Sequence, residues 1–122
     1  KKYIMYSIKV ESSFSSAHNL RGYHGKCESL HGHNWRIEVV AAREKLDKIG
    51  MALDFKFLKA KLNQVLEKLD HKYLNNLAYF KKKNPTSENI AKFIYDSLKP
   101  EVKSLRSVTV WESDTSSSTY EK

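Results

Sequence analysis

The chain has 122 residues, 40% of them hydrophobic and 30% charged, which fits one globular domain over residues 1–122 and excludes a disordered protein. Its formal net charge of +8 attracts polyanions, but the basic residues are dispersed apart from Lys81–Lys83 and accompany no nucleic-acid-binding motif, so no nucleic-acid partner is expected. No segment approaches the roughly 20 apolar residues that cross a bilayer, and no signal-peptide pattern follows Lys1, so we expect a cytoplasmic protein without membrane association.

Two strands joined by a loop are predicted for the first third of the chain. Residues 3–16 are rich in β-branched and aromatic types, and one face of this segment is formed by Ile8, Val10 and Phe14. Residues 19–28 contain two glycines among polar side chains, which is typical of a loop. Alternation returns in residues 31–42, where the apolar face is formed by Trp35, Ile37 and Val39. We expect the two strands to pair.

Two amphipathic helices are predicted next. Asp54 is a suitable N-cap for the first helix, which should end near Leu69 and whose apolar stripe comprises Phe55, Leu58, Leu62, Val65, Leu66 and Leu69. Either Asn84 or Thr86 can cap the second helix, and Pro85 suits its first turn. Pro100 should stop this helix, whose stripe comprises Ile90, Phe93, Ile94 and Leu98.

The tail of the chain returns to the strand pattern. Residues 105–112 alternate and are rich in β-branched types, and residues 116–120 can add a short strand after a turn. The order ββααββ predicts an α+β fold in which a four-stranded antiparallel sheet has two helices on one face. Exposed sheet edges invite pairing with another chain, so closure into an oligomer is one way to remove them.

The segment Cys27–His33, which reads Cys-Glu-Ser-Leu-His-Gly-His, carries the sharpest chemical signal. His31 and His33 are two apart on a strand, so their side chains point the same way and supply two of the three protein ligands of a catalytic zinc. His18, at the end of the preceding strand, is the best third candidate, and His24 in the loop is the second choice. The plain alternative is a pair of surface histidines.

Cys27 is the only cysteine, which rules out an internal disulfide. Its plain interpretation is a small buried hydrophobe. However, it lies in a polar loop just before the histidine pair and next to Lys26, and such surroundings favour the thiolate. We therefore consider it a candidate nucleophile or base.

Three further polar groups have both a chemical and a plain interpretation. Asp70 and His71 can form a hydrogen-bonded acid–imidazole pair, or be two solvated groups at a helix end. Glu112 can lie on the solvent face of its strand, or accept two parallel N–H donors in a pocket. The segment Thr86–Asn89 is most simply a helix start, with anion binding at its N–H groups as the alternative.

Together these motifs resemble the 6-pyruvoyltetrahydropterin synthase superfamily, and within it the bacterial 6-carboxy-5,6,7,8-tetrahydropterin synthases of queuosine biosynthesis. Nearly the whole chain takes part in the resemblance. The matching stretches are residues 14–18, 27–33, 54–55, 69–75, 84–89 and 111–112.

The resemblance implies a role for each candidate residue. Zinc would be bound by His18, His31 and His33. Cys27 would be the catalytic base, and Asp70 with His71 would complete a proton relay. The pterin ring would be anchored by Glu112, in a pocket lined by Thr86 and Ser87. The family also implies the T-fold, in which trimers close a β-barrel and two trimers stack into a homohexamer with sites between subunits.

The implied substrate is 7,8-dihydroneopterin triphosphate, converted to 6-carboxytetrahydropterin, acetaldehyde and triphosphate. The pyruvoyl-forming enzymes are the alternative, because they eliminate triphosphate but keep the side-chain carbons together. Only three residues separate Cys27 from His31, which resembles the bacterial spacing. A further group of the superfamily uses a glutamate as the general base, but nothing in this sequence indicates that a glutamate has replaced the Cys27 thiol. A zinc-stabilised binding module without turnover is the alternative from another class.

Overall fold

The computed structural model describes residues 5–122, except for the side chain of Cys27. Its strands and α-helices are β1 (Tyr6–His18), β2 (His31–Arg43), α1 (Phe55–Leu66), α2 (Ser87–Leu98), β3 (Leu105–Ser113) and β4 (Ser116–Glu121). Short 3-10 helices are η1 (Lys26–Glu28), η2 (Leu74–Asn76) and η3 (Ala78–Phe80). The predicted order ββααββ is therefore confirmed. None of the helices in the described residues is long and apolar enough to span a membrane.

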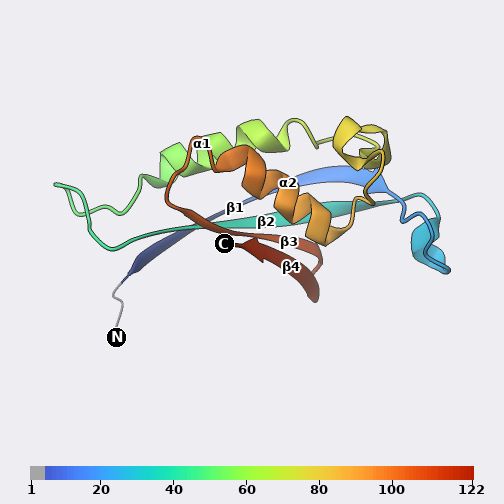
Figure 1. Ribbon diagram of the computed structural model, residues 1–122, viewed down its shortest axis with the longest axis horizontal. Helices are drawn as coiled ribbons and strands as arrows, with labels where there is room; N and C mark the ends of the chain where they lie inside the picture. Colours follow the sequence, from blue (N-terminus) through green and yellow to red (C-terminus); the bar gives the residue numbers. More distant parts are fainter. Residues whose placement is uncertain (1–4) are drawn as a thin grey trace.

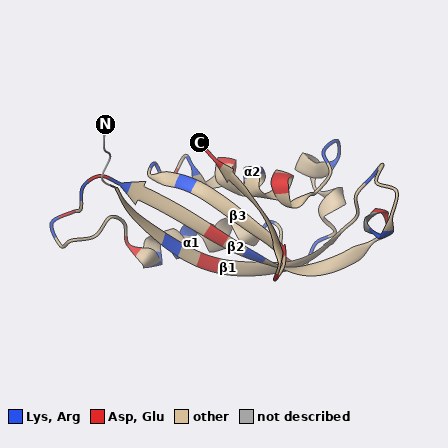
Figure 2. Cartoon of the chain, turned by 90° about the horizontal axis from the view of Figure 1, so that it is seen from below, with Lys and Arg blue, Asp and Glu red and all other residues tan. Residues whose placement is uncertain are grey.

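The four strands form one antiparallel sheet in the order β1-β2-β3-β4. Both helices lie on one face of it, as predicted (Figure 1). Charged residues of both signs lie along the strands (Figure 2), among them Glu38, which pairs with Arg36 at 2.8 Å and Lys9 at 3.7 Å on the face opposite the helices. This face is polar, and the hydrophobic core lies between the sheet and the helices.

Alternation along the strands and the helical stripes produces this core. Phe14 stacks on Trp35, its register partner on β2, with ring centroids 5.9 Å apart. The stripe predicted for α1 is wrong at one position, because Phe55 at the first turn is 58% exposed. Leu69 is buried as expected, but α1 ends at Leu66 and the chain reaches Leu69 through a tight turn in which its N–H donates to the Leu66 carbonyl.

Side-chain caps begin both helices. Asp54 accepts a hydrogen bond from the N–H of Lys56 at 2.8 Å, as predicted. Thr86 is the N-cap of α2, because its hydroxyl accepts from the N–H of Asn89 at 3.1 Å. Pro85 therefore precedes the cap, which corrects its placement in the first turn. The helix ends at Leu98, ahead of Pro100 as expected.

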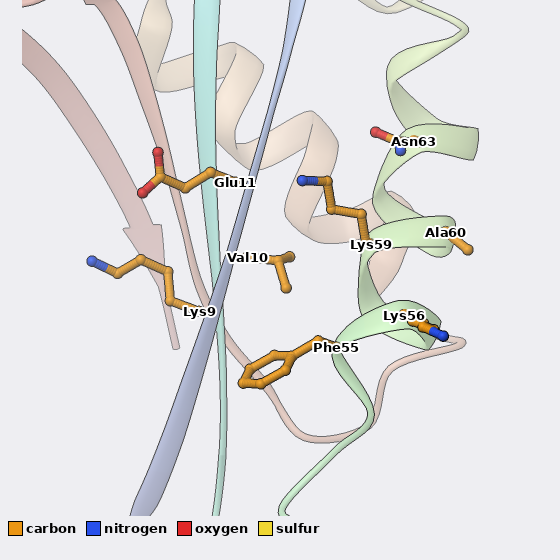
Figure 3. A pocket seen from close by; sticks show the side chains of 8 residues that line it. All are labelled: Lys9, Val10, Glu11, Phe55, Lys56, Lys59, Ala60 and Asn63. Carbon is orange, nitrogen blue, oxygen red and sulfur yellow. The ribbon is translucent and has the colours of Figure 1, made fainter.

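Among the described residues, backbone hydrogen bonds cover the outer edge of β1 at its C-terminal end. Residues 69–73 run beside it, with Ala17 N–H donating to the Lys72 carbonyl at 3.0 Å and a parallel bridge between Ala17 and Tyr73. Beside the N-terminal part, a groove of about 760 Å³ separates β1 from α1. In Figure 3, Val10 points into this groove from β1, and Phe55 and Lys59 line it from α1.

Candidate functional site

The register of the first two strands brings the predicted histidines together. His18 is the register partner of His31, and His33 follows on the same face of β2 as Trp35. Possible ligand atoms of His18, His31, His33 and Glu112 all lie within 4.8 Å of one another. We call these four residues the histidine cluster. His24, the second choice for a ligand, lies outside it in an exposed part of the loop.

Backbone carbonyls determine which ring nitrogens face the centre of the cluster. Nδ1 of His18 lies 2.7 Å from the carbonyl oxygen of Pro85, and Nδ1 of His31 lies 2.7 Å from that of Ser29. A carbonyl oxygen only accepts, so each Nδ1 atom is the donor, and in a ring that carries no second proton the lone pair of Nε2 points inward. These two Nε2 atoms are 3.0 Å apart. Two converging lone pairs are the arrangement that a metal ion requires.

Burial favours the neutral, ligating form of two of the histidines. His18 is 1% exposed, and burial lowers its pKa below the ordinary 6.5. Burial also lowers the pKa of His33, against the opposing effect of the Glu112 carboxylate. Nε2 of His33 is buried without a hydrogen bond of good geometry. Three imidazoles beside a carboxylate, with an unsatisfied nitrogen among them, fit a divalent transition metal.

Glu112 contacts the histidines, which the sequence patterns did not predict. Its Oε1 is 3.0 Å from Nε2 of His33 and 3.6 Å from Nε2 of His18. The cause is the β2–β3 register, which pairs Arg36 with Trp111 and places the next residue on the core face beside the histidines. The alternation of Val108 and Val110 in the sequence indicates that Glu112 shares their face of β3. It does not give the β2–β3 register, which places Glu112 beside the histidines.

Asp70 and His71 do form the predicted pair. Oδ2 of Asp70 lies 2.9 Å from Nδ1 of His71, and Oδ1 accepts the N–H of Ser15 at 2.9 Å. The Ser15 N–H, followed by the hydrogen bond from His71, lowers the pKa of Asp70. His71 has a φ of 54° and donates its N–H to the Ser15 carbonyl at 2.6 Å. The backbone thus holds the pair against the edge of β1.

The pair is not in direct contact with the histidine cluster. Among the described side chains, neither Asp70 nor His71 bonds to any of the four residues of the cluster. His71 is 83% exposed at its side chain, and it lines a pocket of about 550 Å³ together with His33 and Tyr73.

The remaining candidates have other local roles or lie outside what is described. Thr86 acts as the helix cap, which confirms the plain interpretation of this segment. Ser87 is buried, and its hydroxyl lies 2.7 Å from that of Ser118 on β4. The backbone of Cys27 belongs to η1, but its side chain is outside the described part of the chain.

Comparison with known proteins identifies relatives over nearly the whole chain. A model of the 6-pyruvoyl tetrahydropterin synthase family matches residues 7–122. The 6-carboxy-5,6,7,8-tetrahydropterin synthase of Synechocystis sp. is 41% identical over 95% of this chain and 93% of its own length. The enzyme of that name from Haemophilus influenzae is 32% identical over 97% of this chain and 100% of its own.

A solved structure with the same architecture is that of Caenorhabditis elegans 6-pyruvoyl tetrahydropterin synthase. It has a TM-score of 0.88 and 30% identity, and the match covers 100% of this chain and 99% of the other. The likeness confirms the fold predicted for the single chain.

Proposed function

The chain belongs to the 6-pyruvoyl tetrahydropterin synthase family, and we propose that it is a zinc-dependent 6-carboxy-5,6,7,8-tetrahydropterin synthase of queuosine biosynthesis, acting in the cytoplasm. The reaction is the conversion of 7,8-dihydroneopterin triphosphate, with water, to 6-carboxytetrahydropterin, acetaldehyde and triphosphate. Both curated relatives described above carry this name. The convergence of the Nε2 atoms of His18 and His31 is the observation on which the proposal rests.

In this proposal zinc is the metal held by His18, His31 and His33, which is the usual three-ligand set of a catalytic zinc site. Bound there, it would supply a Lewis acid that makes the C–H protons next to a substrate hydroxyl more acidic. The carbonyls of Pro85 and Ser29 keep the first two rings in the ligating tautomer.

The other residues of the chain bind the substrate and move protons. Cys27, as a thiolate, is the general base that removes a substrate proton. The Asp70–His71 pair returns a proton, with the carboxylate orienting the imidazole. Glu112 anchors the guanidine-like edge of the pterin through two parallel hydrogen bonds. Thr86 and Ser87 complete the pterin pocket with the start of α2.

Self-association is part of the proposal, as a homohexamer built from two trimers. Two sheet edges support it, because β1 and β4 are the outer strands of the sheet and unpaired edges are normally covered in stable proteins. The Asp70–His71 pair lies on the edge of β1 and outside the histidine cluster. An edge-to-edge contact would therefore offer this pair to the site of a neighbouring copy.

A pyruvoyl-forming activity is the second candidate, favoured by the name of the C. elegans structure. The two reactions differ in one product, since only the carboxy-forming reaction cleaves a carbon–carbon bond and releases acetaldehyde.

The deciding experiment incubates the zinc-loaded protein and its Cys27→Ala and Cys27→Ser variants with 7,8-dihydroneopterin triphosphate. Acetaldehyde and the mass of the pterin product are measured. We expect acetaldehyde and carboxytetrahydropterin from the wild type and from neither Cys27 variant. A pyruvoyl product without acetaldehyde would instead establish the second candidate, and no turnover by folded, zinc-loaded protein would exclude both.

A further inference from the structure

The loop of residues 19–30 joins two neighbouring histidines of the cluster, since it starts after His18 and ends before His31. Two of its large apolar side chains are exposed, Tyr23 at 53% and Leu30 at 65%, and Leu20 is only half-buried. Around η1 its backbone hydrogen bonds are local, from Glu28 N–H to the Gly25 carbonyl and from Ser29 N–H to the Lys26 carbonyl, both at 3.1 Å. Hydrophobic burial therefore contributes little to the position of this loop.

Two asparagine amides bind the first part of the loop from outside. Oδ1 of Asn75 accepts the N–H of Asn19 at 3.0 Å, and Nδ2 of Asn75 donates to the carbonyl of Asn19 at 2.9 Å. Asn84 repeats this pattern on Arg21, with the same distances of 3.0 Å and 2.9 Å. Each amide thus satisfies both backbone groups of one loop residue, as a neighbouring strand would.

Both asparagines are themselves held by the body of the protein. Asn75 is 5% exposed and belongs to η2. The carbonyl of Asn84 accepts from Nδ2 of Asn89 in the first turn of α2 at 2.8 Å. The amides are therefore fixed with respect to the same helix start that supplies the Pro85 carbonyl to His18.

Two further contacts strengthen the attachment. The Arg21 guanidinium donates to the carbonyl of Phe80 at 2.5 Å. The Tyr73 hydroxyl donates to Oδ1 of Asn19 at 2.5 Å. The loop is thus attached through polar groups of residues 19 and 21, six to eight positions before Cys27.

We propose that Asn75 and Asn84 are positioning residues, which hold the backbone of the loop that carries Cys27 in the conformation needed for proton removal. This inference rests on the proposed function, in which Cys27 is the base. Neither asparagine touches the substrate in this role. Each acts through the loop, and a base displaced by about 1 Å costs up to roughly 100-fold in rate.

Asn84→Ala is the main test, because Asn84 is only partly buried and its loss leaves the core intact. Asn76→Ala is the matched control, since Asn76 is a neighbouring, exposed asparagine of η2. Amide hydrogen exchange is measured on the zinc-loaded proteins. The Arg21 amide should exchange about tenfold faster in Asn84→Ala, with no change for strand β2 or in Asn76→Ala.

Turnover measurements test whether the hydrogen bonds from Asn75 and Asn84 to the loop matter for catalysis. We expect Asn84→Ala to lower kcat about 10- to 100-fold with KM and zinc content unchanged. Asn84→Asp keeps the acceptor for the Arg21 N–H, so it should recover part of both the exchange protection and kcat. Asn75→Ala should resemble Asn84→Ala wherever it folds.

The outcomes separate this inference from the proposed function. If the wild type does not turn over the pterin, the proposed function fails. The exchange data then still show whether Asn84 holds the backbone of the loop. If the wild type is active and folded Asn84→Ala loses Arg21 protection but keeps its kcat, the asparagines are structural only and the inference is wrong. Unchanged exchange at Arg21 would also overturn it.

Discussion

His18 and His31 face each other across the β1–β2 pair with their Nε2 atoms 3.0 Å apart, while each Nδ1 is tied to a backbone carbonyl. In the tautomer that donates from Nδ1, neither ring has a proton on Nε2 to offer the other at this contact. Two lone pairs held this close repel each other, and a cation between the histidines removes that repulsion. Metal binding should therefore stabilise the fold as well as create the site.

The first prediction concerns metal removal. Stripping the protein with a chelator should lower its melting temperature, and adding zinc should restore it, because zinc binds the folded state. At zinc concentrations of 100 times Kd the gain is about 2.7 kcal/mol. Calorimetry at several zinc concentrations measures this. A melting temperature that does not respond to zinc would contradict the site.

The second prediction assigns the ligands by comparing two histidines. His31→Ala should lower zinc affinity at least tenfold, because one converging nitrogen is lost. His24→Ala is the control, since His24 is exposed and lies outside the histidine cluster. Competition with a chromogenic chelator gives both affinities. Equal affinity in the two variants would show that His31 is not a ligand.

The third prediction distinguishes two roles of Glu112. As a pterin anchor, Glu112→Gln should raise KM or lower kcat/KM by roughly 10-fold or more, because the loss of a charge-assisted hydrogen bond costs about 1.5–3 kcal/mol. Zinc affinity should then be little changed. A large fall in zinc affinity with a modest kinetic effect would identify Glu112 as a metal ligand, a role that its distance of 3.0 Å from His33 allows.

The fourth prediction concerns acid stability. The Ser15 N–H and His71 hold the pKa of Asp70 below the ordinary 3.8 in the folded state. The stabilisation is therefore complete at pH values well above 3.8 and is lost as the pH falls through the lower, folded-state pKa. Urea unfolding at a series of acidic pH values should show a shallower loss of stability in Asp70→Asn. The effect should be small, because the Asp70 side chain is 40% exposed.

Much of the site followed from local patterns, and the remainder depended on tertiary register. The two-residue spacing of His31 and His33 on a strand places them on one face in any sheet, so this part could be predicted. Glu112 joined them only through the β2–β3 register. Asn75 and Asn84 lie more than 50 residues along the chain from the loop residues that they bind. Hydrophobic periodicity in the sequence carries no information about such long-range contacts.

Errors in the helices have a similar physical origin. Phe55 fits the apolar stripe of α1 by spacing, but it lies at the first turn, where it lines the groove beside β1 and stays exposed. Pro85 suits a first helical turn by its fixed φ. In the structure the Thr86 hydroxyl instead accepts a hydrogen bond from the N–H of Asn89. Thr86 is therefore the N-cap, and α2 begins at Ser87.

The last prediction tests assembly through the edge of β1. Ser15 and Ala17 direct their N–H groups out of the sheet, toward Asp70 and Lys72. Residues two apart on a regular strand repeat this direction, and β1 pairs with β2 without a bulge, so the N–H of Glu11 also points outward. Proline at this position removes a donor that the sheet itself does not use.

Glu11→Pro should therefore fold but form smaller assemblies, whereas Glu11→Ala, which keeps the N–H, should assemble like the wild type. Both variants lose the same ion pair with Arg36, so a difference between them reports on the backbone donor. Sedimentation velocity gives the assembly size and circular dichroism verifies the fold. If the Asp70–His71 pair serves a neighbouring copy, turnover should fall together with assembly in Glu11→Pro alone. A fully active, folded monomer would show instead that each chain completes its own site.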